Sequence, residues 1–111
     1  MTVKQLTYKT GWKLCAGSGE EEISSAYVCD LLSWVMANGK PGTAWITVQV
    51  HENVLAVASL HDFSCVIIPD SIELSKKFQS TADEKDITVL SAPCTSYGAA
   101  AALANLGIGE V

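Results

Sequence analysis

The chain has 111 residues, of which 49% are hydrophobic and 17% are charged. A chain of this length fits one domain and can bury roughly two-thirds of its unfolded surface. Its high hydrophobic fraction and low charged fraction exclude a disordered protein. Seven lysines and no arginine stand against twelve carboxylates, which gives a formal net charge of -5. This balance disfavours contact with nucleic-acid phosphates or with an anionic membrane, so we expect neither partner and treat residues 1–111 as a single domain.

The four cysteines predict a reduced, cytoplasmic protein. No pair of them has the C-x-x-C spacing of a zinc or redox motif. No apolar run approaches the ~20 residues of a membrane span, and the first ten residues lack the apolar core of a signal peptide. Disulfides are rare in that setting, so we expect free thiols that pack as small hydrophobic side chains.

The first third of the chain predicts one helix and two extended segments. Thr2 and Gln5 have the spacing of a capping box at the start of a helix over Thr2–Lys9, and Gly11 can end it. Extended segments are expected to follow at Trp12–Ala16 and Ile23–Cys29. These N-terminal strands can run antiparallel to the rest of a sheet.

A second helix is expected after Asp30, which has the side chain of an N-cap residue. Leu31, Leu32, Val35 and Met36 then form one apolar stripe at helical spacing, and a Gly- and Pro-containing turn follows Asn38.

From residue 44 onward, apolar strands and helices alternate. The predicted strands are Ala44–Val50, Cys65–Ile68 and Ile87–Leu90, and the predicted helices are Asn53–Leu60, Ser71–Ala82 and Ser96–Leu106. Short apolar strands without alternation are typical of parallel sheets that are covered on both faces. We therefore predict an α/β fold, with a mostly parallel sheet built from repeated βα units over residues 44–106 and extra N-terminal strands.

The predicted ligand site lies where the parallel strands end, since ligands of such sheets bind at the carboxyl ends of strands. Each of these ends leads into a helix N-terminus, whose free amides favour an anion or a nucleotide. The alternative is that Asn53, Ser71 and Thr95 or Ser96 only cap their helices. The candidate ligand-binding residues are Gln49, His51, Asn53, Asp70, Pro93, Cys94, Thr95 and Ser96.

Catalysis and metal binding receive less support from the residues. Cys94 near a helix N-terminus could act as a nucleophile with His51 as its base, but no third orienting group is visible. His51 and His61 lie at opposite ends of one predicted helix, roughly 15 Å apart, so they cannot share a metal ion. None of the common nucleotide-binding, hydrolase or metalloprotease motifs occurs, and we expect no catalytic residue, metal or cofactor.

Three residues are candidates for an interface with another protein chain. Trp34 lies at the margin of the apolar stripe, and an exposed tryptophan often marks an interface. Ala56 and Ala58 give the following helix a small-residue face that allows close approach of a neighbour, and a second copy of the chain is the expected one. Trp45, by contrast, opens a strand and is expected in the core.

The chain resembles the DRTGG domain family over roughly residues 2–107. The most specific segments read Tyr-Val-x-Asp-Leu-Leu-Ser and Trp-Ile-Thr-x-Gln-x-His-x-Asn. The resemblance is carried by Ala26–Asn38, Ala44–Ala58, Cys65–Pro69 and Val89–Pro93. The positions shared with the family are Tyr27, Asp30, Gln49, His51 and Asn53. The name-giving Asp-Arg-Thr-Gly-Gly motif would fall at Glu22–Ala26, where the arginine and both glycines are absent.

The resemblance implies a fold similar to the N-terminal domain of HPr kinase/phosphorylase. It also implies a non-catalytic, regulatory and dimer-forming domain, since such domains accompany catalytic domains in phosphate acetyltransferases and in some pyrophosphatases. Stand-alone copies occur beside genes for iron-only hydrogenases, which implies a second role as an adaptor for a larger redox enzyme. Three hypotheses therefore stand: a ligand-sensing regulatory homodimer, a protein-interaction module of this kind, and a cysteine-dependent enzyme.

Overall fold

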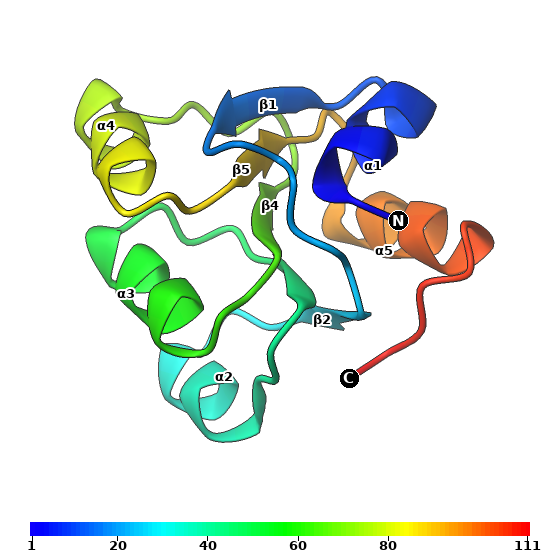
Figure 1. The fold of residues 1–111 in the computed structure, drawn as a ribbon, viewed down its shortest axis with the longest axis horizontal. Coiled ribbons are helices and arrows are strands. Elements are labelled where there is room, and N and C mark those ends of the chain that lie inside the picture. Colours follow the sequence, from blue (N-terminus) through cyan, green and yellow to red (C-terminus); the bar gives the residue numbers. More distant parts are fainter.

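A computed structural model describes residues 1–111 as a three-layer α/β/α sandwich (Figure 1). A five-stranded sheet with the order β1-β5-β4-β3-β2 forms the middle layer. The elements in chain order are α1 (Val3–Thr10), β1 (Lys13–Ala16), β2 (Ser25–Val28), α2 (Leu32–Asn38), β3 (Thr43–Ile46), α3 (Glu52–Leu60), β4 (Cys65–Ile68), α4 (Lys76–Glu84), β5 (Val89–Ser91) and α5 (Ser96–Asn105).

The sheet confirms the predicted fold class. Strands β2, β3, β4 and β5 pair in parallel, one after the next, while β1 joins the far side of β5 in the antiparallel direction. Of the two N-terminal strands that could run antiparallel, only β1 does so. No helix has the length and apolar character that crossing a lipid bilayer requires.

Two apolar cores lie on opposite faces of the sheet. One contains side chains of α2, α3 and α4, and the other contains side chains of α1 and α5. Successive strand residues serve alternate faces. Trp45 and Val66 point into the first core, whereas Ile46 and Ile67 point into the second, and all four are fully buried. The central strands are apolar throughout because both of their faces are covered.

The N-terminal helix forms as its sequence predicts. The Thr2 hydroxyl accepts the Gln5 N–H at 3.2 Å, and the Gln5 side chain accepts the Thr2 N–H at 2.9 Å. This capping box satisfies two backbone donors that the first turn leaves free. Gly11 ends the helix at φ 76°, a left-handed conformation that glycine adopts without steric cost.

Three predicted helix starts are wrong. The N-cap residue of α2 is Leu31, with no side-chain bond, rather than Asp30. The N-cap of α3 is His51 rather than Asn53. The N-cap of α4 is Ser75 rather than Ser71, because Asp70 and Ser71 adopt positive φ angles of 60° and 52° in a turn that precedes the helix.

Of the five predicted strands, only Cys65–Ile68 has the predicted limits. The segment expected as a strand over Ala44–Val50 leaves the sheet after Ile46, and Val48 and Val50 are partly exposed. The strand expected at Ile87–Leu90 begins only at Val89. The C-terminal residues add a short parallel pairing outside β2, where the Ala26 N–H donates to the Gly109 carbonyl at 2.9 Å and the Val111 N–H donates to the Ala26 carbonyl at 3.2 Å.

Candidate functional site

The loops that follow β2, β3, β4 and β5 meet at one edge of the sheet, which we call the carboxyl edge. Between β2 and β3 it is organised by Asp30. One carboxylate oxygen of Asp30 accepts the Thr47 hydroxyl at 2.8 Å and the Val48 N–H at 2.9 Å, and the Asp30 carbonyl accepts the Gln49 amide at 3.3 Å. The side chain expected to cap a helix therefore fixes the loop of the neighbouring strand, and Gln49 is held beside it.

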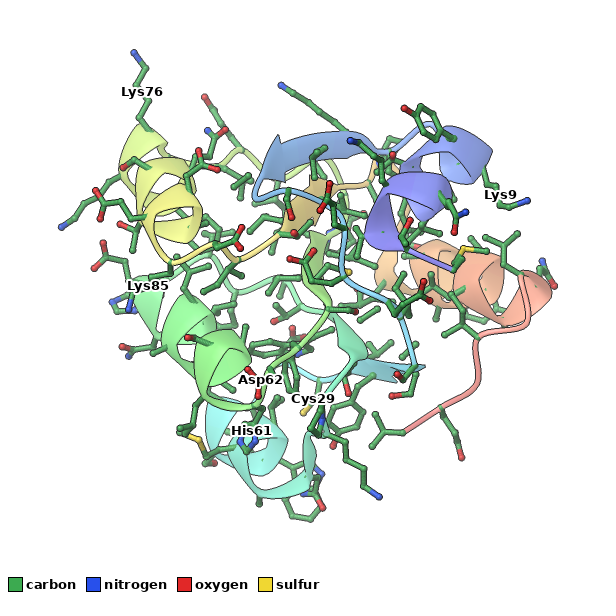
Figure 2. All side chains as sticks on the ribbon, viewed as in Figure 1. Lys9, Cys29, His61, Asp62, Lys76 and Lys85 are labelled. Atoms are coloured by element: carbon green, nitrogen blue, oxygen red, sulfur yellow. The ribbon has the colours of Figure 1, made fainter.

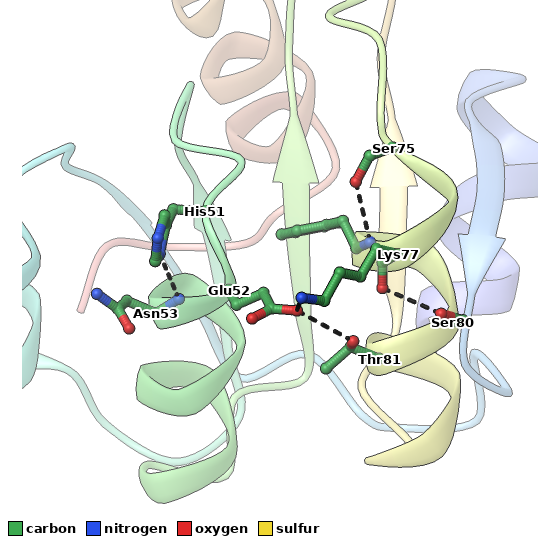
Figure 3. A network of polar contacts seen from close by, with 8 residues as sticks. His51, Glu52, Asn53, Ser75, Lys77, Ser80 and Thr81 are labelled. Carbon is green, nitrogen blue, oxygen red and sulfur yellow. Dashed lines mark hydrogen bonds and ion pairs between the residues drawn. The ribbon is translucent and has the colours of Figure 1, made fainter.

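The N-cap residue of α3 is a histidine, His51. The His51 Nδ1 accepts the Asn53 N–H at 3.1 Å, which places a ring nitrogen where a hydroxyl or carboxylate usually caps a helix (Figure 3). The next residue, Glu52, points toward α4, where its carboxylate lies 3.6 Å from the Lys77 ammonium and accepts the Thr81 hydroxyl at 3.4 Å. His51, as an acceptor in this cap, holds its loop against the helix.

The loops after β4 and β5 are joined by their own backbones. The Asp70 N–H donates to the Cys94 carbonyl at 2.7 Å, and the Ser71 N–H donates to the Ala92 carbonyl at 3.0 Å. These bonds extend the β4–β5 pairing past the ends of both strands. They also use two of the amides that could have bound an anion at this edge.

The start of α5 keeps two free donors. The Thr95 hydroxyl accepts the Gly98 N–H at 3.2 Å, so Thr95 rather than Ser96 is the N-cap residue. The backbone N–H groups of Ser96 and Tyr97 have no hydrogen-bond partner within the protein. A helix N-terminus of this kind carries a partial positive charge and attracts anions.

The structure brings together only part of the predicted site. Asp70 contacts the Pro93–Ser96 loop through Cys94, while Gln49, His51 and Asn53 belong to the β3 loop. Because β4 lies between β3 and β5, the His51 and Cys94 loops are separated by about 10 Å of sheet. The His51 Nδ1 accepts the Asn53 N–H and no hydrogen bond joins it to the Cys94 thiol, so the structure does not assemble the pair that the alternative of a cysteine-dependent enzyme requires.

An apolar groove between α2 and α3 lies beside this edge. Its volume is about 420 Å³, and its walls are formed by Leu32, Ser33, Met36, Asn53, Ala56 and Val57. Ala56, predicted for an interface, lines this groove. Ala58 is buried, with 2% of its surface exposed, and therefore belongs to the core. Trp34 is 57% exposed but lies on the other side of α2, in a hollow with Tyr27 and Lys40.

The groove residues that the sequence analysis missed had a visible signal. Leu32 and Met36 stand four residues apart in the predicted apolar stripe of this helix, but neither is among the predicted interface residues. Only Val35 of α2 is buried, because α2 lies at the margin of the sheet and has a helical neighbour on one side only (Figure 1). Met36 is 43% exposed as a result.

The thiols differ strongly in their surroundings. Cys65 is fully enclosed in β4, and this burial raises its pKa to about 12. Burial also raises the pKa of Cys15, against the opposing effect of the Lys13 ammonium. Cys29 is partly exposed and lies near the start of α2, with its thiol 3.7 Å from the Leu31 carbonyl (Figure 2). A neutral, enclosed thiol is chemically inert, so Cys65 has a packing role.

No family model matches this sequence. No curated protein matches it either. Among solved structures, the chain is similar to the crystal structure of the CBS and DRTGG domains of the regulatory region of Clostridium perfringens pyrophosphatase, complexed with the activator diadenosine tetraphosphate. The TM-score is 0.71 at 14% identity, over 92% of this chain and 45% of that one. The chain thus spans less than half of the regulatory region and shares its type of α/β fold.

Proposed function

We propose that this chain is a non-catalytic regulatory domain that acts as a homodimer through the α2–α3 groove. The observation that carries this proposal is the exposed apolar surface of α2, whose seven residues bury only Val35. An apolar side chain left in water loses the burial free energy of about 25 cal/mol per Å², so such a surface favours a partner.

A second copy is the partner that the charge distribution favours. The protein carries a net charge of -5, and two copies repel each other wherever their carboxylates meet. Residues 31–38 contain no ionisable side chain, and Glu52 is the only one in α3. Glu52 points to α4 rather than into the groove. Two copies can therefore meet at this face without bringing like charges together.

Sedimentation equilibrium over a range of concentrations tests the dimer. We expect Ala56→Glu to convert the dimer into a monomer, because the substitution places a carboxylate in the apolar groove. Ser59→Glu is the matched control, since Ser59 is exposed on the same helix but does not line the groove. A monomeric wild-type chain, or an Ala56→Glu variant that associates as well as the wild type, would contradict the proposal.

A second function is favoured by the free amides at the start of α5. We propose that the carboxyl edge binds a small anionic metabolite or nucleotide near Pro93, Cys94, Thr95 and Ser96, with Gln49, His51, Asn53 and Asp70 on the adjoining loops. The Ser96 and Tyr97 N–H groups supply donors there. The regulatory region with the similar fold was crystallised with a nucleotide activator, which supports testing this ligand class first.

Thermal denaturation with diadenosine tetraphosphate, ATP and inorganic phosphate tests the second function. A ligand that binds the folded state raises the unfolding temperature, and the stabilisation grows with the logarithm of its concentration above Kd. The effect should disappear in Ser96→Pro, because proline at the first helical position removes the Ser96 donor but fits the helix. Equal shifts of the unfolding temperature for the variant and the wild type would show that the ligand binds elsewhere. If none of the three compounds shifts the unfolding temperature, none of them is a ligand of this protein.

A further inference from the structure

We propose that a hollow between β1 and the loop before α4 binds a free α-amino acid with an aliphatic side chain. This β1 hollow has a volume of about 390 Å³ and lies on the face of the sheet that α4 covers (Figure 1). Its lining includes Lys13, Cys15, Ser71, Ile72, Glu73 and Leu74. It shares no residue with the α2–α3 groove or with the residues proposed for the anion, so the inference goes beyond both proposed functions.

One wall of the β1 hollow is formed by an irregular part of β1. Its pairing with β5 is regular up to Leu14, and Ala16 then takes the register position that Cys15 would occupy. Cys15 is therefore the additional residue of a β-bulge, and its side chain is half-buried at the hollow. Bulges change the direction of side chains and are frequent at sheet edges and next to active sites. The bulge in this edge strand therefore marks the hollow as a candidate site.

The opposite wall is the loop between β4 and α4. Ser71 in this loop has a positive φ of 52°, a conformation that strains residues other than glycine. Strained backbone of this kind concentrates at active sites and ligand clamps. The Ser71 N–H donates to the Ala92 carbonyl at 3.0 Å. The Gln79 amide donates to the Leu74 carbonyl at 3.2 Å, so the protein itself holds both ends of this wall.

Two side chains of opposite charge line the β1 hollow without pairing. Lys13 belongs to β1, and Glu73 belongs to the loop before α4. Both ion pairs of the protein involve other residues, so neither charge is neutralised within the chain. Burial raises the pKa of the Cys15 thiol and the Lys13 ammonium opposes this effect, which places the ammonium near the wall of the hollow. One unpaired cation and one unpaired anion thus line the same space.

A zwitterion fits this pair of charges better than a simple anion or cation does. A ligand carboxylate at Lys13 and a ligand ammonium at Glu73 would form two charge-assisted hydrogen bonds at once. A ligand with a single charge would bring that charge close to a like charge on the other wall. Ile72 and Leu74, which are partly buried, add an apolar part to the lining. An aliphatic α-amino acid carries all three complementary groups in one small molecule.

Equilibrium dialysis of the full chain against radiolabelled L-leucine tests the proposal, and we expect saturable binding. Two competitors each lack one charge of leucine: 4-methylpentanoate lacks the ammonium, and 3-methylbutylamine lacks the carboxylate. Each should compete about fivefold or more weakly than unlabelled leucine. Equal competition by leucine and by either compound would overturn the zwitterionic ligand. If leucine, isoleucine and valine all fail to bind up to their solubility limits, the proposal is wrong.

Two substitutions remove the charges of the β1 hollow one at a time. Lys13→Gln and Glu73→Gln keep side chains of similar length at exposed positions, so both variants should fold. Each should weaken the binding of leucine about threefold or more. Lys9→Gln and Glu84→Gln are matched controls, since both residues are exposed and neither lines the hollow. An unchanged affinity in either hollow variant would overturn the assigned site.

The Cys15 thiol reports where the ligand binds. Leucine should slow the alkylation of Cys15 in proportion to the fraction of protein that it occupies, as measured by mass spectrometry of the digested protein. Cys29 is partly exposed but does not line the hollow, so it should react at the same rate with and without leucine. An unchanged rate at Cys15 under saturating leucine would show that the amino acid binds elsewhere and would overturn the proposal.

Discussion

The helices α3 and α2 are neighbours with similar apolar content, yet they bury very different shares of it. α3 buries Val54, Leu55, Val57 and Ala58, whereas α2 buries Val35 alone. α3 lies over the middle of the sheet with α2 on one side and α4 on the other, while α2 lies over the margin (Figure 1). The comparison shows that position over the sheet, rather than composition, decides whether an apolar helix supports the fold or presents a surface.

The largest effect is expected at the centre. Leu55→Ala should lower the free energy of unfolding by about 2–5 kcal/mol, because it leaves a cavity in a fully closed core. Trp34→Ala removes a larger side chain at the margin but should cost about 1 kcal/mol or less, since 57% of that side chain is already in water. Urea denaturation of both variants measures the difference. Equal losses would show that α2 is as much part of the core as α3.

The buried Cys65 should make the stability of the core depend on pH. Burial raises the pKa of Cys65 to about 12, so the folded state holds this proton more tightly than the unfolded chain does. The resulting stability is fully present below the ordinary thiol pKa and is lost as the pH rises toward 12. The loss should reach about 1.4 kcal/mol per pH unit within this window.

Cys65→Ala is the control for this prediction, because other groups also titrate above pH 9. Its unfolding free energy should fall less steeply with pH than that of the wild type. Alkylation gives a second measurement, in which the partly exposed Cys29 should react in the folded protein while Cys65 stays protected. Identical pH slopes for variant and wild type would show that Cys65 does not contribute.

Substitution of Asp30 tests whether its hydrogen bonds hold the loop after β3 in place. Asp30→Ala removes the acceptor of the Thr47 hydroxyl and the Val48 N–H, and we expect a loss of about 1–2 kcal/mol. Asp30→Asn keeps one side-chain oxygen and should retain most of this stability. Chemical denaturation measures both, with amide exchange at Val48 as a local readout. A larger loss for asparagine than for alanine would contradict the bonding role.

The smallest effect is an expected gain at the start of α2. Leu31 occupies the N-cap position in an extended conformation and makes no side-chain bond to the helix. Leu31→Ser should therefore stabilise the fold by about 0.5–1 kcal/mol, because serine can accept a free N–H of the first turn. Thermal denaturation checks this gain. A decrease would indicate that the exposed Leu31 side chain contributes packing that the structure does not suggest.

Local patterns predicted those elements whose signals do not depend on distant residues. The Thr2–Gln5 spacing predicted the first helix, the apolar run Cys65–Ile68 predicted a buried strand, and Thr95 was one of two candidate caps for the last helix. The errors occurred where a side chain had two possible partners. Asp30 bonds to Thr47, seventeen residues away, rather than to its own helix, and nothing in the local sequence distinguishes the two arrangements.

The candidate site was predictable in location but not in detail. Parallel strands place the loops after β3, β4 and β5 on one edge, which follows from the strand and helix alternation alone. That the Asp70 and Ser71 amides would be consumed by the β5 loop could not be foreseen, because it depends on the register of β4 against β5. Trp34 and Ala56 were both predicted as interface residues, but only the structure shows that they line different hollows, on different sides of α2.

The sequence by itself determined that the chain builds a covered, mostly parallel α/β sheet, since strand and helix propensities and the buried apolar runs act within short stretches. The tertiary structure decided which apolar residues face water and which backbone groups stay unpaired. Leu32, Val35 and Met36 follow the same helical spacing, yet only Val35 is enclosed. That outcome is set by the order of strands in the sheet and by where the sheet ends, which are properties of contacts between distant segments.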